Sequence, residues 1–134
     1  MTDTTDALQR WLALEHEAVW LYPVIGARFD ALTKTARTSF EAHRDTRDDL
    51  IARLRTMGVE PVATQLSYDV GPLANPAEAK EAARVLESSI SAACLAMVGV
   101  TEDALRKYAI RGLTKAARAE LAWGAQPQAF PGLP

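Results

Sequence analysis

Apolar residues recur along most of the chain at steps of three and four, the spacing that places side chains on one face of an α-helix. Four segments carry this pattern, at about residues 6–31, 34–57, 76–98 and 101–123. No segment shows the strict alternation of apolar and polar residues that is typical of a half-buried strand. The pattern therefore predicts an all-α fold with four main helices.

Residues at the ends of these segments match the usual helix start and stop signals. Asp6 is the predicted N-cap of the first helix, and Gly58 and Gly99 are predicted to end the second and third. The third helix has the strongest start signal, with Asn75 as cap and Pro76 at the first helical position.

Two segments lack helical periodicity. Residues 58–75 include Pro61, Gly71 and Pro72, and are long enough to run the full height of a bundle, so the helices before and after them can be parallel. Residues 124–134, rich in proline and glycine, are predicted to form an extended tail with Phe130 and Leu133. We expect one domain over residues 1–134, a four-helix bundle with a long crossover between its second and third helices.

Charged residues interrupt the apolar stripes of three predicted helices. Glu15, His43 and Arg47 hold inward positions, and Glu87 lies at the edge of its stripe. Glu15 and Arg47 are equally far along the chain from the first turn, so they are expected at one level. A buried carboxylate needs a partner. We therefore predict that Arg47 bridges Glu15 and Glu87, and that Tyr22 or Glu15 is the partner of His43.

Composition narrows the classes of function. The chain has 15 basic and 17 acidic residues, and their mixing along the sequence argues against the concentrated positive face that binds nucleic acid. The single Cys94 lies in an apolar run and is expected to be a buried thiol. The N-terminus does not resemble a signal peptide, and no window approaches the roughly 18 apolar residues of a membrane span. A cytoplasmic protein without membrane contact is expected.

Several short motifs, together with the long second connection, resemble those of known proteins. They are Glu15-His16-Glu17, the run Ala42-His43-Arg44-Asp45-Thr46-Arg47-Asp48, and Phe130-Pro131-Gly132-Leu133. The chain resembles the ferritin-like superfamily, and more narrowly a bacterial ferritin-like domain family whose function is unassigned. This resemblance implies a ferritin-like four-helix bundle and implies no particular reaction.

In ferritin-like di-iron proteins, a Glu from each of two helices and a Glu-x-x-His pair from each of the others bind two metal ions. The resemblance matches Glu15 and Glu87 to the single glutamates and His43 to one histidine. Phe40 stands where the first pair needs its carboxylate, and the last predicted helix has no histidine. Arg47 would add a fixed positive charge. No metal is favoured; an iron or manganese ion would have Glu15, His43 and Glu87 as ligands.

The first predicted helix also carries apolar residues on its outward side, namely Ala13, Trp20, Val24 and Ala27. An exposed strip of this kind is unusual in a monomer. It could be covered by the C-terminal tail or a loop, or by a second copy of the chain packed by two-fold symmetry. These residues are the candidates for a homodimer interface.

Three functions remain open from sequence. The leading hypothesis is a non-enzymatic binding or assembly module with a Glu-Arg-Glu core in place of a di-iron site. The first alternative is an iron or manganese oxidoreductase that uses Glu15, His43 and Glu87. The second is a binder of a small anionic ligand, which would pair with Arg47 near Tyr22.

Overall fold

The fold is known from a computed structural model that describes residues 2–133. Its described residues form four α-helices and one short 3-10 helix, with no strand. The elements are α1 (Thr2–Arg28), η1 (Asp30–Leu32), α2 (Thr33–Thr56), α3 (Pro76–Val100) and α4 (Asp103–Ala122). The all-α class and the four main helices predicted from the apolar pattern are confirmed.

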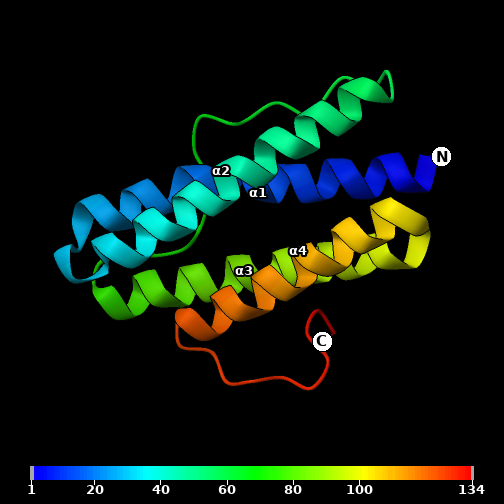
Figure 1. Cartoon of the computed structure of the whole chain (residues 1–134). Helices are drawn as coiled ribbons and strands as arrows, with labels where there is room; N and C mark the ends of the chain where they lie inside the picture. The colour runs from blue at the N-terminus through cyan, green and yellow to red at the C-terminus, as the bar shows by residue number, and fades with distance from the viewer. Residues whose placement is uncertain (1, 134) are drawn as a thin grey trace.

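The helices are arranged as two antiparallel hairpins (Figure 1). α1 packs on α2, α3 packs on α4, and the hairpins join through α1 and α3. Residues 57–75 run back along the bundle, so that α2 and α3 start at the same end. α2 and α4 make almost no backbone contact with each other. This gap leaves one side of the bundle open.

The core is built from the inward stripes of all four helices. Its largest fully buried side chains are Trp11, Tyr22 and Trp123, surrounded by leucine, isoleucine and alanine. Alanine is frequent in the buried faces of α3 and α4, which lets these two helices approach closely. The core therefore combines three large aromatic rings with many small side chains.

Helix ends agree with the predictions in part. The N–H of Glu78 donates to Asn75 Oδ1 at 2.9 Å, and Gly58 adopts a φ of 74°, as expected of a cap and a helix stop. Asp6 is not a cap, because α1 already begins at Thr2. Gly99 does not end α3, which continues to Val100. Tertiary packing of an apolar helix outweighs the weak helix propensity of one glycine.

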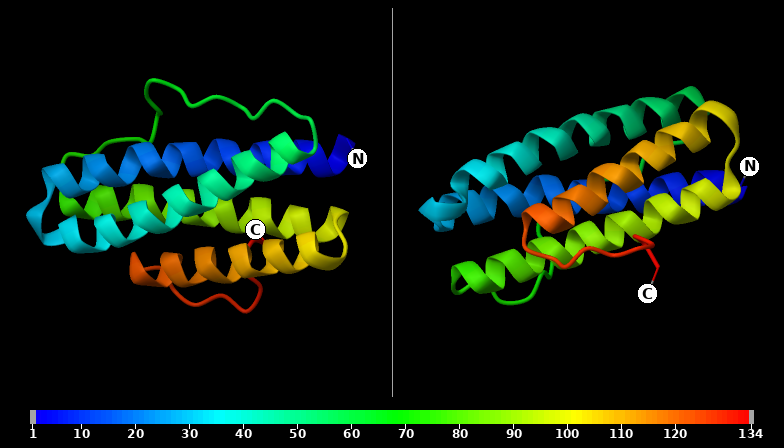
Figure 2. Two further views of the ribbon diagram at one scale, coloured as in Figure 1. Left: turned by 45° about the horizontal axis from the view of Figure 1, so that its top comes forward. Right: turned by 60° about the horizontal axis from the view of Figure 1, so that its bottom comes forward.

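The connection between α2 and α3 is fastened to α1. Gln9 donates to Glu60 O at 2.8 Å and accepts from Val62 N–H at 2.7 Å. Further along α1, the ring of Trp20 packs against Tyr68, with 5.9 Å between ring centroids. Figure 2 shows the connection arching over α1.

Tyr68 thus partly covers the outward apolar strip of α1. Trp20 and Val24 are half-buried, whereas Ala13 and Ala27 remain exposed. Residues 124–133 contain no helix and return alongside α3, where a Cβ on Gly132 would lie 2.8 Å from Ser91 O (Figure 2). The tail therefore does not cover the strip, and the dimer interface stays a prediction.

One helix bears on the expectation about membranes. α3 contains an 18-residue window with a mean hydropathy of 1.4, so by length and composition it is apolar enough to cross a membrane. In this fold the helix packs between α1 and α4, with Leu86, Ile90 and Met97 in the core.

Candidate functional site

A buried ion-paired cluster joins three helices in the middle of the bundle. Glu15 lies on α1, His43 on α2 and Glu87 on α3, and their exposed fractions are 1, 9 and 0%. The His43 ring lies between the two carboxylates. Its Nδ1 is 2.5 Å from Glu15 Oε1, and its Nε2 is 2.7 Å from Glu87 Oε2.

Two aromatic side chains complete the cluster. Trp11 Nε1 donates to Glu15 Oε2 at 2.9 Å, and the Tyr22 hydroxyl donates to Glu87 Oε2 at 2.5 Å. The Tyr22 ring also stacks on His43, with ring planes 10° apart. We refer to Trp11, Glu15, Tyr22, His43 and Glu87 as the polar layer.

The polar layer holds His43 in its charged form. Burial alone would lower the pKa of His43, but attraction and hydrogen bonding by Glu15 and Glu87 together exceed that effect. They raise the pKa of His43 from 6.5 to about 10. Both ring nitrogens then carry protons and donate to the carboxylates. The layer therefore contains two carboxylates and one imidazolium at neutral pH.

The predicted role of Arg47 is wrong. Arg47 points outward and pairs with its neighbour Asp48, at 3.0 Å from Nε and 2.9 Å from Nη2 to Oδ1. His43, one helical turn earlier on the same face of α2, occupies the bridging position instead. His43 and Arg47 are four residues apart, about 6 Å along the helix axis, and this difference is too small to be resolved by counting residues along separate helices. The core is Glu-His-Glu, not Glu-Arg-Glu.

A second polar group, not predicted from the sequence, lies beside the layer. Glu87 Oε1 and Ser91 Oγ are buried, and neither has a hydrogen-bond partner among the described residues. Glu120 on α4 is 8% exposed, and burial raises the pKa of its carboxyl group. Glu120 could have been found from the sequence, because it lies four residues after buried Ala116 and therefore on the same face of α4. Trp11, four residues before Glu15, could have been found in the same way.

Cys94 lies close to the polar layer. Burial, together with the negative charges of Glu15 and Glu87, raises the pKa of its thiol. A Cβ on Gly112 of α4 would lie 3.0 Å from Cys94 Sγ. The predicted buried thiol is therefore confirmed, and it lies between α3 and α4.

The layer does not present a set of converging metal ligands. Each ring nitrogen of His43 is directed at a different carboxylate, so Glu15 and Glu87 lie on opposite sides of the ring. Either nitrogen would have to leave its partner before it could bind a metal. Among residues 2–133, no three His, Cys, Asp or Glu side chains are placed to hold one ion. In this arrangement Glu15, His43 and Glu87 pair with one another.

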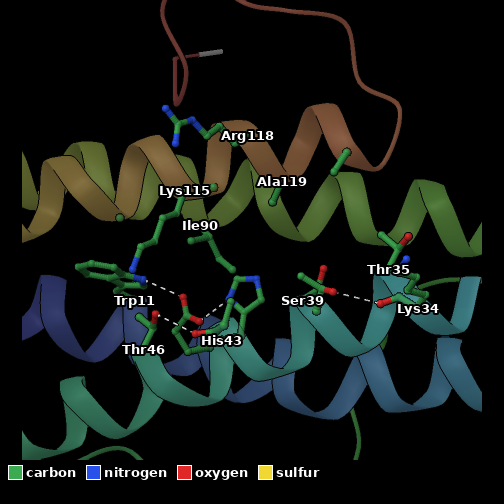
Figure 3. Close-up of a pocket in the computed structure, with 16 residues that line it drawn as sticks. Trp11, Lys34, Thr35, Ser39, His43, Thr46, Ile90, Lys115, Arg118 and Ala119 are labelled. Carbon is green, nitrogen blue, oxygen red and sulfur yellow. Dashed lines mark hydrogen bonds and ion pairs between the residues drawn. The ribbon is translucent and has the colours of Figure 1, made fainter.

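A cleft of about 760 Å³ opens beside the layer, between α2 and α4 (Figure 3). Glu15 and His43 form part of its wall. Space for the cleft is left by small lining residues, namely Ala42, Gly112, Ala116, Ala119 and Ala122. Near one end Arg53 lies over the Tyr108 ring, 4.0 Å from its centroid. Trp123 Nε1, just after the end of α4, donates to Ser39 Oγ on the α2 wall of the cleft at 3.2 Å.

Comparisons with known proteins give a family and a fold. A family model described as "Domain of unknown function (DUF4439)" matches residues 7–134. A similar solved structure is the crystal structure of a conserved hypothetical protein, rv2844, from Mycobacterium tuberculosis. It is 26% identical, with a TM-score of 0.86, over 91% of this chain and 95% of that one. No functionally curated protein matches the chain at a significant level.

Proposed function

The chain belongs to this family of unknown function, and we propose that it is a non-enzymatic, ferritin-like binding module whose ligand occupies the cleft between α2 and α4. The cleft itself carries the proposal. Its volume of about 760 Å³ falls within the range of small-molecule sites, and its walls combine apolar side chains with a few polar groups.

The chemistry of the neighbouring groups supports binding over catalysis. A general base works best with a pKa near the operating pH, and His43 is held protonated by two carboxylates. Tyr22 is no better placed, because burial and Glu87 raise its pKa well above 10. Burial also raises the pKa of Cys94, which keeps the thiol from acting as a nucleophile. His43, Tyr22 and Cys94 are therefore not poised for proton transfer or nucleophilic attack at neutral pH.

The surroundings of α1 make ligand binding a better-supported role than assembly through this helix. The largest side chain of the outward strip, Trp20, already packs against Tyr68 of the same chain. The cleft, by contrast, remains open between α2 and α4, although Trp123 Nε1 donates to Ser39 on its α2 wall. The cleft is therefore the apolar surface that remains available to a ligand.

Titration with Nile red, a neutral dye that fluoresces in apolar surroundings, tests the proposal. The wild-type protein should bind the dye, and tryptophan side chains that fill the cleft from either wall should exclude it. Ala42→Trp on α2 and Ala119→Trp on α4 are such variants. Ala104→Trp places the same side chain on an exposed part of α4 outside the cleft and should leave binding unchanged.

Circular dichroism would verify that each variant is folded. Failure of the wild-type protein to bind the dye, or equal binding by the two filled variants, would refute the cleft as a ligand site.

A further inference from the structure

Resting on the proposed function, we infer that the ligand is an elongated apolar molecule with a carboxylate at one end, and that Lys115 binds this carboxylate. The inference follows from the charges that line the cleft, the direction of one side chain, and the length of the cavity.

The charges along the cleft are mostly positive. Lys34, Lys115 and Arg118 line it, and Glu15 is the only acidic lining residue. Glu15 is already paired with the imidazolium of His43 and accepts from Trp11. The three cations, by contrast, form no ion pair with any residue in the described part of the chain. An anion entering the cleft therefore meets uncompensated positive charge.

The direction of the side chains selects one of these cations. Figure 3 shows Lys115 extending from α4 into the cleft toward Trp11, whereas Arg118 points away toward the C-terminal tail. Lys34 lies at the opposite end of the cavity. Lys115 is exposed in the free protein. An apolar ligand in the cleft would exclude water from its ammonium group, which strengthens a charge-assisted hydrogen bond to a carboxylate.

The shape of the cleft indicates the rest of the molecule. Its lining on α2 extends from Lys34 to Thr46, which corresponds to roughly 18 Å of helix axis. The opposite wall, on α4, consists largely of alanine beyond Lys115. An aliphatic chain can lie along this wall with its carboxylate at Lys115.

Three probes of equal chain length separate the head groups: decanoate, 1-decanol and decylamine, each below its micellar concentration. Their affinities follow from displacement of Nile red from the wild-type protein. Decanoate should bind about tenfold more tightly than decanol, the effect of one charge-assisted hydrogen bond. Lys115→Met, which keeps the length of the side chain but removes its charge, should abolish this preference. Arg118→Met is the matched control and should retain it.

The outcomes distinguish the two proposals. Nile red bound in the cleft but displaced equally by all three probes would overturn the carboxylate inference and leave the binding site standing. Tighter binding of decylamine would also overturn it, because Glu15 would then be the recognition group. A larger loss with Lys34→Met than with Lys115→Met would contradict the assignment of Lys115. Sedimentation showing a dimer whose dissociation is needed for dye binding would assign the cleft to a second copy of the chain.

Discussion

His43 is the residue on which the buried charges depend. It donates to Glu15 through one ring nitrogen and to Glu87 through the other, so its removal would leave two buried carboxylates without a cation. Such a loss is more damaging than the loss of an ion pair at the surface, because water cannot solvate the remaining charge. Arg47 and Asp48 form the corresponding surface pair on the same helix.

Substitution of these two residues should therefore differ in its effect on stability. We expect His43→Ala to lower the free energy of unfolding by about 3–5 kcal/mol. Arg47→Ala should lower it by less than about 1 kcal/mol, since its partner is exposed. Urea denaturation of both variants at pH 7 measures the difference. Comparable losses would mean that Arg47 shares the bridging role.

The raised pKa of His43 also makes stability depend on pH. The stabilisation is complete below the unfolded pKa of about 6.5 and is lost as the pH rises toward the folded value of about 10. Between pH 6.5 and 8.5, wild-type stability should fall by up to about 3 kcal/mol. His43→Gln should show a much flatter profile. Parallel profiles for the two proteins would show that another group titrates.

The polar layer could be predicted in part from the sequence. Glu15, His43 and Glu87 were found because a charged residue in an apolar stripe is visible without a structure. The sequence could not decide whether His43 or Arg47 bridges the two carboxylates, because both lie on one face of α2, one turn apart. It depends on the relative height of three helices, which side-chain packing determines.

At the scale of the helices, α4 can approach α1 closely because Gly112 has no Cβ. A Cβ on Gly112 would lie 2.5 Å from the Trp11 ring, closer than real Cβ atoms come to other atoms. Trp11 cannot easily move, because its Nε1 donates to Glu15 and its ring packs on Tyr108. Gly112 is therefore required for the position of α4.

Two glycine-to-alanine substitutions test this requirement. Gly112→Ala should destabilise the protein by about 1–3 kcal/mol through overpacking. Gly99, also inside a helix, has nothing within 4 Å of its Cβ position. Gly99→Ala should therefore stabilise the protein by about 0.5–1 kcal/mol, because alanine has the higher helix propensity. Thermal unfolding would measure both, and equal shifts for the two variants would contradict the contact with Trp11.

The elements differ in how far they were predictable. The four helices follow from apolar periodicity, and the caps at Asn75 and Gly58 follow from local chemistry. The path of residues 57–75 across α1 does not. It depends on single contacts, such as those of Gln9 with Glu60 and Val62, which leave no periodic signal in the sequence.

For the whole molecule, the open contact between α2 and α4 implies unequal stability. α1 and α3 each pack on two helices, whereas α2 and α4 each pack mainly on one. Local opening follows the number of supporting contacts. The outer helices should therefore open more readily than the inner pair.

Hydrogen exchange measured by mass spectrometry tests this difference. Amides of α2 and α4 that face the cleft should exchange faster than those in the middle of α1 and α3. A ligand in the cleft, such as decanoate, should slow exchange in α2 and α4 selectively, because it bridges them. Uniform protection across all four helices, with or without decanoate, would contradict the two-hairpin picture.

Because Cys94 is buried, the rate at which its thiol reacts measures how often α3 and α4 separate. Its thiol lies between α3 and α4 and is held protonated, so a disulfide reagent such as dithionitrobenzoate can react only when these helices separate. The labelling rate in the native protein should therefore report how often this hairpin opens. Gly112→Ala should accelerate labelling strongly and Gly99→Ala should not. Fast labelling of the wild-type protein would show that α3 and α4 separate far more often than their packing suggests.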